Sequence, residues 1–310
     1  MVKKIKHYKK FNILKKHKGS ILLIGNFDGI HLGHQKLFYK AKQLKNKNKK
    51  IKIGLITFDP MPKMFFNKDI KNFKISNFNQ KISYLKNFSV DFVINKKFDK
   101  KFSKIKSKDF IDKILFKKLK PKFIFVSSNF RFGNKREGNV RLLKDYQKKY
   151  KYKLINPTPL IRNKKVISST LIRKLLFQGK LEYANNLLNR KWSVEGVVKR
   201  GRRIGKKVGF PTCNLELGDY IIPKKGVYAV RAKIEDGKKS IKGIANLGFR
   251  PTFNQKKILL EVNLFNFSKN IYNKKLTVEF IKFIRKEKKF KGINQLRKQI
   301  KKDLIIAKKT

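Results

Sequence analysis

Residues 21–34 read ILLIGNFDGIHLGH, and this stretch decides the fold of the first part of the chain. The apolar run 21–24 predicts a buried strand, the following glycines and aspartate predict a turn, and residues 34–45 predict a helix. His31 and His34 lie three residues apart, so both imidazole rings can project from one face of that helix. A helix N-terminus favours anions because its first backbone N–H groups have no partner within the helix. The stretch therefore predicts a phosphate-binding turn, in preference to two polar histidines on an exposed turn.

The composition is that of a globular chain of two domains. The 310 residues include 40% hydrophobic residues and 27 Phe, and no apolar run approaches the ~18 residues of a membrane span. Residues 1–18 are basic but lack the apolar core of a signal peptide. A single cysteine, Cys213, excludes an internal disulfide framework and a multi-cysteine zinc site. We expect a soluble cytoplasmic protein without a membrane partner.

The net charge of +63, from 82 Lys and Arg against 19 Asp and Glu, is the property that most suggests nucleic-acid binding. The excess is nearly all lysine, spread from end to end, and accompanies abundant Asn, Ile and Phe. These are residues that AT-rich codons favour, so genomic base composition explains the charge. We expect weak, salt-sensitive binding to polyanions and no specific nucleic-acid partner.

Strand and helix patterns alternate in the first part of the chain and change in the second. Strands predicted at 51–58, 91–94 and 123–126, with helices at 107–118 and 139–150, indicate a parallel sheet covered on both faces. In such a sheet the ligand binds beyond the carboxyl ends of the strands. Later strands are predicted at 192–199, 227–234, 241–246, 258–265 and 276–284, followed by a helix whose apolar positions are Ile293, Leu296, Ile300 and Leu304. This pattern predicts a small antiparallel β-barrel with a terminal helix, and domains at 1–187 and 188–310.

Two motifs of the first domain support a family resemblance. Residues 25–34 resemble the G-x-F-D-G-x-H-x-G-H signature of bacterial bifunctional riboflavin kinase/FAD synthetases, and residues 167–173 (ISSTLIR) resemble their I-S-S-T-x-I-R. The resemblance implies a Rossmann-like nucleotidyltransferase domain in which His31, His34 and Arg173 act on the phosphates of ATP. It also implies further ATP-binding residues: Gly25, Asn26, Phe27, Gly33, Ser168 and Thr170.

Two loops of the same domain resemble the flavin-side loops of that family. They are residues 57–62 (TFDPMP) and 129–133 (NFRFG), and the implied flavin-binding residues are Asp59, Pro60, Asn129 and Phe132. Many members have Gly-Asp-Asp or Gly-His-Asp where this chain has Ser-Ser-Asn at 127–129.

The second domain resembles the flavokinase half of the same family. Residues 201–214 end in GFPTCN, close to the family's G-F-P-T-A-N, and residues 260–264 (LEVNL) resemble L-E-V-H-L. The resemblance makes Glu261 the catalytic base and Thr212 and Asn214 the ligands of Mg²⁺, for which neutral oxygens are suitable. The implied ATP-binding residues are Gly201, Gly205, Lys206, Gly209 and Pro211, and the implied flavin-binding residues are Arg285 and Phe290, within an R-x-E-x-x-F pattern. Cys213 replaces a small alanine, so we interpret it as a packing residue.

The resemblance covers about residues 18–303 and implies a bifunctional enzyme. It would convert riboflavin and ATP to FMN, and then FMN and ATP to FAD and pyrophosphate, with Mg²⁺ in both steps and no obligate protein partner. Two alternatives stay open. One is a monofunctional riboflavin kinase with a decayed adenylyltransferase domain, which the altered 127–129 loop favours; the other is a basic nucleic-acid-binding module with relic motifs.

Overall fold

The computed structural model describes residues 4–200, 209–235, 237, 239–252 and 255–310. By their internal contacts they form two compact units. Unit 1 comprises Met1–Lys71 and Phe78–Ser168, and unit 2 comprises Asn72–Asn77 and Ser169–Thr310.

Unit 1 is built on a six-stranded sheet in which every neighbouring pair is parallel, in the order β1-β4-β3-β2-β5-β8. These strands are β1 (Lys6–Tyr8), β2 (Ile21–Ile24), β3 (Ile53–Asp59), β4 (Phe92–Lys97), β5 (Phe123–Phe125) and β8 (Lys153–Ile155). The main helices are α1 (Leu32–Lys47), α3 (Phe78–Leu85), the wide π-type η3 (Phe110–Leu119) and α6 (Val140–Asp145). The smaller elements are η1 (Lys15–His17), α2 (Pro62–Phe66), η2 (Lys86–Phe88), α4 (Lys100–Ser103), α5 (Ser107–Asp109), β6 (Arg131–Phe132), η4 (Asn134–Arg136), β7 (Gly138–Asn139), β9 (Ile161–Arg162) and β10 (Lys165–Val166).

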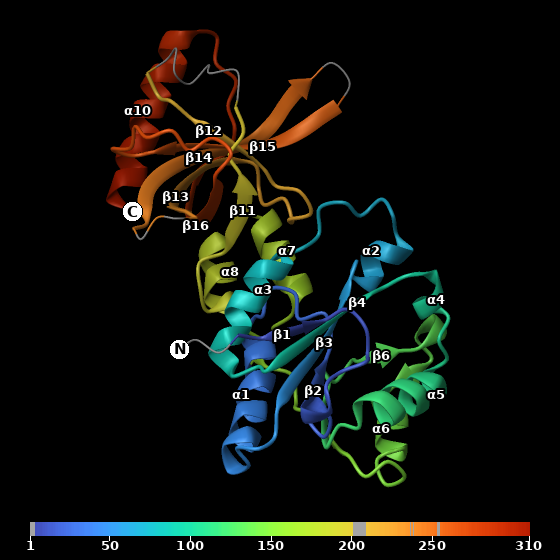
Figure 1. Ribbon diagram of the computed structural model, residues 1–310. Helices are drawn as coiled ribbons and strands as arrows, with labels where there is room; N and C mark the ends of the chain where they lie inside the picture. The colour runs from blue at the N-terminus through green and yellow to red at the C-terminus, as the bar shows by residue number, and fades with distance from the viewer. Residues whose placement is uncertain (1–3, 201–208, 236, 238, 253–254) are drawn as a thin grey trace. The chain divides into compact units, whose positions relative to one another are not determined.

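Alternate residues of β2 enter two different cores, which confirms the predicted two-sided parallel sheet. Ile21 and Leu23 pack in a cluster with α1 residues such as Phe38, whereas Leu22 and Ile24 pack with η3 residues such as Ile111. All four β2 side chains are buried. Figure 1 shows α1 and α3 on one side of this sheet, and α5 and α6 on the other.

Helix boundaries in unit 1 differ from the predictions in two places. Helix α1 begins at Leu32, two residues before the predicted start, with His31 as its N-cap residue. The helix predicted over 139–150 ends at Asp145, and turns continue to Lys151, whose φ of 50° is left-handed and incompatible with a continuing helix.

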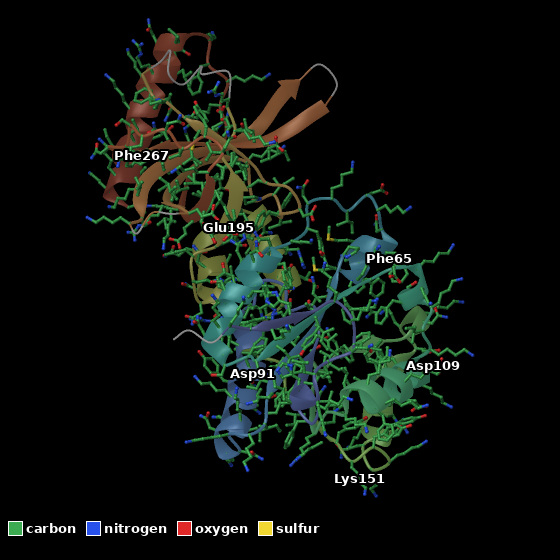
Figure 2. The ribbon with its side chains drawn as sticks, in the orientation of Figure 1. Phe65, Asp91, Asp109, Lys151, Glu195 and Phe267 are labelled. Carbon is green, nitrogen blue, oxygen red and sulfur yellow. The ribbon has the colours of Figure 1, made fainter. Side chains whose placement is uncertain are left out.

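A buried ion pair links α1 to the start of β4, since the Lys45 ammonium lies 2.6 Å from the Asp91 carboxylate; Figure 2 labels Asp91.

Unit 2 is an antiparallel six-stranded sheet in the order β11-β16-β13-β14-β15-β12. Its strands are β11 (Ser193–Val197), β12 (Cys213–Glu216), β13 (Gly226–Ile234), β14 (Ile241–Thr252), β15 (Gln255–Leu264) and β16 (Lys275–Arg285). The two ends of the sheet approach each other, because Lys199 N–H donates to the Asn214 carbonyl at 2.9 Å in an isolated bridge beyond β11. The predicted barrel is therefore confirmed, with β12 as a strand that the sequence pattern did not predict.

Helices α7 (Ser169–Phe177), α8 (Leu181–Leu188) and α10 (Ile293–Lys309) complete unit 2. Helix α10 contacts β13, β14 and β16, and α8 contacts β16 and α7. Residues 72–77 also belong here: Trp192 Nε1 donates to the Ile75 carbonyl at 2.9 Å, and Asn77 Nδ2 donates to Glu195, labelled in Figure 2, at 3.0 Å. Contacts thus group α7 and α8 with the barrel, whereas the change in sequence pattern predicts a domain boundary near residue 187.

Candidate active sites

The predicted phosphate-binding turn lies where β2 ends and α1 begins. The rings of His31 and His34 stack with their centroids 3.7 Å apart and an interplanar angle of 23°, and His31 is buried. Three residues of the turn have left-handed φ values, 46° at Phe27, 77° at Gly29 and 39° at Ile30. Strand, turn and helix therefore place both imidazoles together in the first turn of α1, as their spacing predicts.

Gly33 is required by the close approach of its neighbours. A Cβ added at this position would lie 3.1 Å from the Ile167 carbonyl oxygen and 3.2 Å from the His31 ring. Both distances are shorter than ordinary contacts, so only glycine fits without displacing something. The Ile167–Ser168 end of the second motif therefore lies beside the histidine pair within unit 1.

A buried lysine that the sequence did not identify supports the same turn. Lys81 of α3 is 7% exposed, and its ammonium donates to the Asn26 carbonyl at 2.7 Å and to Thr57 Oγ1 at 3.1 Å. Thr57 Oγ1 donates in turn to the Asn26 carbonyl at 3.2 Å. The Asn26 side-chain oxygen is buried and has no hydrogen-bond partner among the residues that the structure describes. Nothing in the sequence distinguishes Lys81, because its burial becomes visible only after α3 packs against the sheet.

The predicted flavin-side loops lie at the ends of β3 and β5. Asp59 is the exposed last residue of β3 and is joined to Pro60 by a cis peptide bond. Asn129 is exposed and lines a pocket of about 420 Å³ together with three arginines, Arg131, Arg136 and Arg141. Phe132 is 8% exposed, and its ring packs in the core against Phe110 and Phe130, with centroids 5.4 and 5.5 Å away.

Thr170 and Arg173 lie on α7 and belong to unit 2. The Arg173 Nε donates to the Phe73 carbonyl at 2.8 Å, and the guanidinium carbon lies 3.6 Å from the centroid of the Phe73 ring. Within its own unit, Arg173 is thus fixed on the 72–77 segment by a hydrogen bond and a cation–π contact.

The kinase residues come together on two paired strands of unit 2. Asn214 of β12 lies directly opposite Glu261 of β15 in the antiparallel register. Directly opposite residues project to the same face of a sheet, and Thr212, two residues before Asn214, shares that face. Thr212 and Glu261 line a pocket of about 320 Å³. Asn214 is buried, and its side-chain oxygen has no hydrogen-bond partner in the described part of the chain.

Two further residues of the predicted motifs lie on the same paired strands, Asn263 on β15 and Cys213 on β12. The Asn263 amide, where the family pattern has His, donates to the Pro211 carbonyl at 2.7 Å and so fixes the end of the loop before β12. Burial raises the pKa of the Cys213 thiol from 9.0 to about 12, so it stays protonated and inert at neutral pH. Gly201, Gly205 and Lys206 lie outside the described residues.

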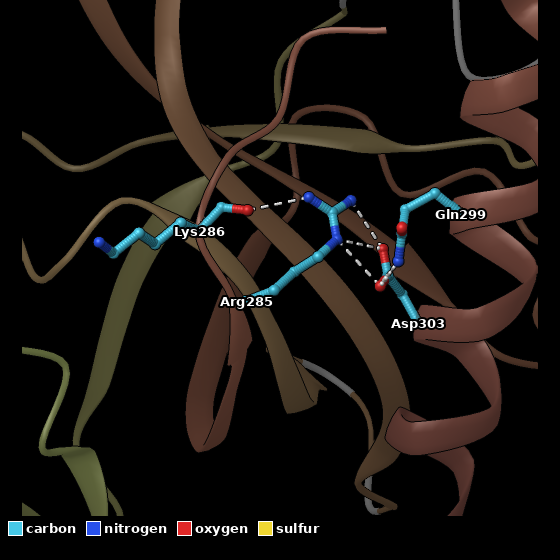
Figure 3. Close-up of polar contacts among 4 residues, drawn as sticks. All are labelled: Arg285, Lys286, Gln299 and Asp303. Carbon is cyan, nitrogen blue, oxygen red and sulfur yellow. Dashed lines mark hydrogen bonds and ion pairs between the residues drawn. The ribbon is translucent and has the colours of Figure 1, made fainter.

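Arg285 and Phe290 also line this pocket, with Glu287 between them in sequence. The Arg285 guanidinium lies 5.8 Å from the Phe290 ring centroid and is bound by Asp303 of α10 (Figure 3). Sequence analysis identified Arg285 and Phe290 but missed Asp303, which only appeared as a polar position on an amphipathic helix.

The fold and the two motif clusters define a two-domain ATP-dependent transferase. A family model described as FAD synthetase matches residues 13–171, and one described as riboflavin kinase matches residues 188–310. The chain belongs to the bifunctional riboflavin kinase/FMN adenylyltransferase family.

Relatives of that name match almost the whole chain. The protein from Buchnera aphidicola subsp. Schizaphis graminum is 42% identical over 301 residues, covering 96% of both chains. The protein from Escherichia coli K12 is 33% identical, covering 94% of this chain and 92% of its own. A solved structure from Streptococcus pneumoniae, described as a macrolide-efflux protein, aligns with a TM-score of 0.87 at 28% identity and 99% coverage of each chain.

The chain is a bifunctional enzyme with riboflavin kinase and FMN adenylyltransferase activities, because both domains and the named relatives agree. This function fits the comparisons better than either a lone kinase or a nucleic-acid-binding module. Among the described helices, none is both long enough and apolar enough to cross a membrane.

Proposed function

We propose that the two reactions are divided between the two motif clusters. Riboflavin is phosphorylated at the unit 2 pocket around Glu261, and FMN is adenylylated at the turn that holds His31 and His34. The observation that most supports the division is the register that pairs Asn214 with Glu261 next to the pocket, far in sequence from the histidines.

In the kinase reaction we assign Glu261 as the general base. Its carboxylate takes the proton of the ribityl 5′-hydroxyl, whose oxygen attacks the γ-phosphorus of ATP and displaces ADP. Glu261 is half-buried and lines the pocket, so it is accessible to a bound hydroxyl. Arg285 and Phe290 also line this pocket, and the aromatic side chain of Phe290 suits the flat flavin ring.

The side-chain oxygens of Thr212 and Asn214 fit a divalent cation such as Mg²⁺. The Asn214 oxygen is buried without a hydrogen-bond partner among the described residues, and a buried acceptor of this kind requires a donor or a cation. A bound Mg²⁺ would neutralise phosphate charge on ATP.

In the adenylyltransferase reaction we assign His31 and His34 to the phosphates of ATP. A phosphate oxygen of FMN attacks the α-phosphorus and pyrophosphate leaves, so the enzyme must align the two phosphates and neutralise charge on the leaving group. Ring N–H groups at the N-terminus of α1 provide donors where the helix already favours an anion. Arg173 is assigned to the β- and γ-phosphates. Gly25, Asn26, Phe27, Gly33, Ser168 and Thr170 are assigned to the remainder of the nucleotide.

We place the flavin contacts of this reaction at Asp59, Pro60, Asn129 and Phe132, at the end of β3 and in the segment that follows β5, at the carboxyl end of the sheet. We further propose a cytoplasmic enzyme that acts without a protein or nucleic-acid partner. This location suits an enzyme that uses ATP twice.

Two substitutions test the division of labour in a chromatographic time course with riboflavin, ATP and Mg²⁺. His31→Ala should abolish FAD formation and leave FMN formation unchanged. Glu261→Gln should lower FMN formation by at least about 100-fold, the usual contribution of a general base, and leave FAD formation from added FMN unchanged. An equal loss of both activities in either variant would refute the assignment.

A further inference from the structure

Helix α10 contains one carboxylate that is buried against the barrel. Asp303 is 2% exposed in a chain that has 19 acidic residues against 82 basic ones. Its oxygens accept from Arg285 Nε at 3.0 and 2.9 Å, from Arg285 Nη2 at 2.8 Å, and from Gln299 Nε2 at 2.9 Å (Figure 3). Two planar groups joined in this way are fixed in orientation as well as in distance.

Arg285 is fixed by its backbone as well. It ends β16, and a Cβ added at Gly226 of β13 would lie 2.1 Å from the Arg285 carbonyl oxygen, so the two strands are in direct backbone contact there. Its Nη1 donates to the Lys286 carbonyl at 2.9 Å. One guanidinium therefore joins α10 to the first residue of the segment 286–290.

That segment and α10 line the same pocket as Glu261. Glu287, Lys288 and Phe290 come from the segment, whereas Leu296, Ile300 and Asp303 come from α10. The Arg285–Asp303 pair thus lies where two parts of the pocket lining meet, and its side chains are only 16% and 3% exposed. A pair that served only to attach the helix could lie anywhere along the contact between α10 and the barrel.

We propose that Asp303 is a positioning residue for the riboflavin kinase reaction. By holding Arg285, Asp303 fixes Arg285 and the segment 286–290 in the orientation that binds the flavin ring. Helix α10 is thereby a component of the kinase site. This inference rests on the proposed assignment of the pocket to riboflavin.

The test uses the full chain and compares Asp303→Asn with the unsubstituted enzyme. Asparagine keeps the size and one acceptor but removes the charge and the two-oxygen contact with the guanidinium. The KM for riboflavin should rise about tenfold, which corresponds to about 1.4 kcal/mol. The KM for ATP and kcat should change less than about twofold, because Arg285 and the segment 286–290 are assigned to the flavin and not to the reacting phosphates. Arg285→Lys should give the same selective rise, and the double variant no further rise, since the two side chains act as a unit.

Ala307→Gly is the matched control. Ala307 is a buried residue of the same helix outside the pocket lining, and glycine there weakens α10 by about 1 kcal/mol without touching Arg285. A similar rise in the riboflavin KM in Ala307→Gly would show that Asp303 merely attaches the helix, and would overturn the inference.

Folding is followed through Trp192, the single tryptophan, which is buried in unit 2. If Asp303→Asn loses the native Trp192 fluorescence, the test uses the variant Gln299→Ala in place of Asp303→Asn. Gln299→Ala removes only one hydrogen bond to Asp303, so the riboflavin KM should rise about twofold to threefold. An unchanged KM would refute the inference. If Glu261→Gln keeps full kinase activity, the assignment of the pocket to the kinase reaction is wrong. If Glu261→Gln abolishes kinase activity while Asp303→Asn and Gln299→Ala leave the riboflavin KM unchanged, only the inference about Asp303 fails.

Discussion

Replacing Gly33 by alanine tests whether the position of the His31 ring determines adenylyl transfer. The added methyl group would lie 3.2 Å from the ring and 3.1 Å from the Ile167 carbonyl oxygen, so a neighbour must move by a few tenths of an ångström. A misplacement of 1 Å in a catalytic geometry costs about 100-fold in rate, so this smaller shift should cost about fivefold in kcat/KM. That loss corresponds to about 1 kcal/mol.

The assay measures FAD formation from FMN and ATP, and FMN formation from riboflavin serves as the internal control. Stability should not fall, because alanine favours a helix over glycine by up to about 1 kcal/mol and this gain offsets the crowding. Gln43→Ala, at an exposed position of the same helix, is the matched control and should leave both activities unchanged. Unchanged FAD formation in Gly33→Ala would refute the argument that the ring must lie where the structure places it, and an equal fall in both activities would refute the separation of the sites.

Three further predictions concern buried groups. Since burial raises the pKa of the Cys213 thiol from 9.0 to about 12, the contribution of this thiol to folding stability should be fully present below pH 9 and should be lost as pH rises toward 12, by up to about 1.4 kcal/mol per pH unit; denaturant titrations of Cys213→Ala should lack this contribution. Trp192→Phe loses the hydrogen bond to the Ile75 carbonyl and part of a buried ring, so unit 2 should lose about 2–3 kcal/mol, which calorimetry would detect as a lower Tm and an unchanged Tm would contradict. Lys81→Met removes the buried ammonium that holds the Asn26 carbonyl, so FAD formation should fall about tenfold with FMN formation retained, and an unaltered FAD rate would show that the turn does not need this support.

Much of the fold could be predicted because local patterns determined it. The all-apolar β2 and the glycine turn after it predicted a strand buried on both faces and a ligand site at its end, and both cores that receive β2 side chains are present. Helix α6 was predicted too long because its apolar spacing continues beyond Asp145, whereas the left-handed Lys151 cannot be read from the sequence. Strand β12 was missed because it is short and follows a glycine-rich stretch of sequence.

The site residues that were missed are those that act through a partner distant in sequence. Lys81 and Asp303 are ordinary surface residue types on amphipathic helices, and only the packed structure shows that their charges are buried. Glu261 and Asn214 were found by motif, but their direct pairing follows from strand register, which no local pattern specifies.

The segment 72–77 affects how this enzyme is made. It leaves the ribosome while unit 1 is still incomplete, yet its partners Trp192, Glu195 and Asp219 belong to the barrel. At about 10 residues per second, those partners emerge roughly ten seconds later. The polypeptide also passes between the two compact units three times, after Lys71, Asn77 and Ser168, so no single proteolytic cut or gene fission separates them cleanly. A fragment that begins at Ser169 would lack the acceptor of the Trp192 indole, and splitting the enzyme into two independent proteins would require that segment to be supplied to the kinase half.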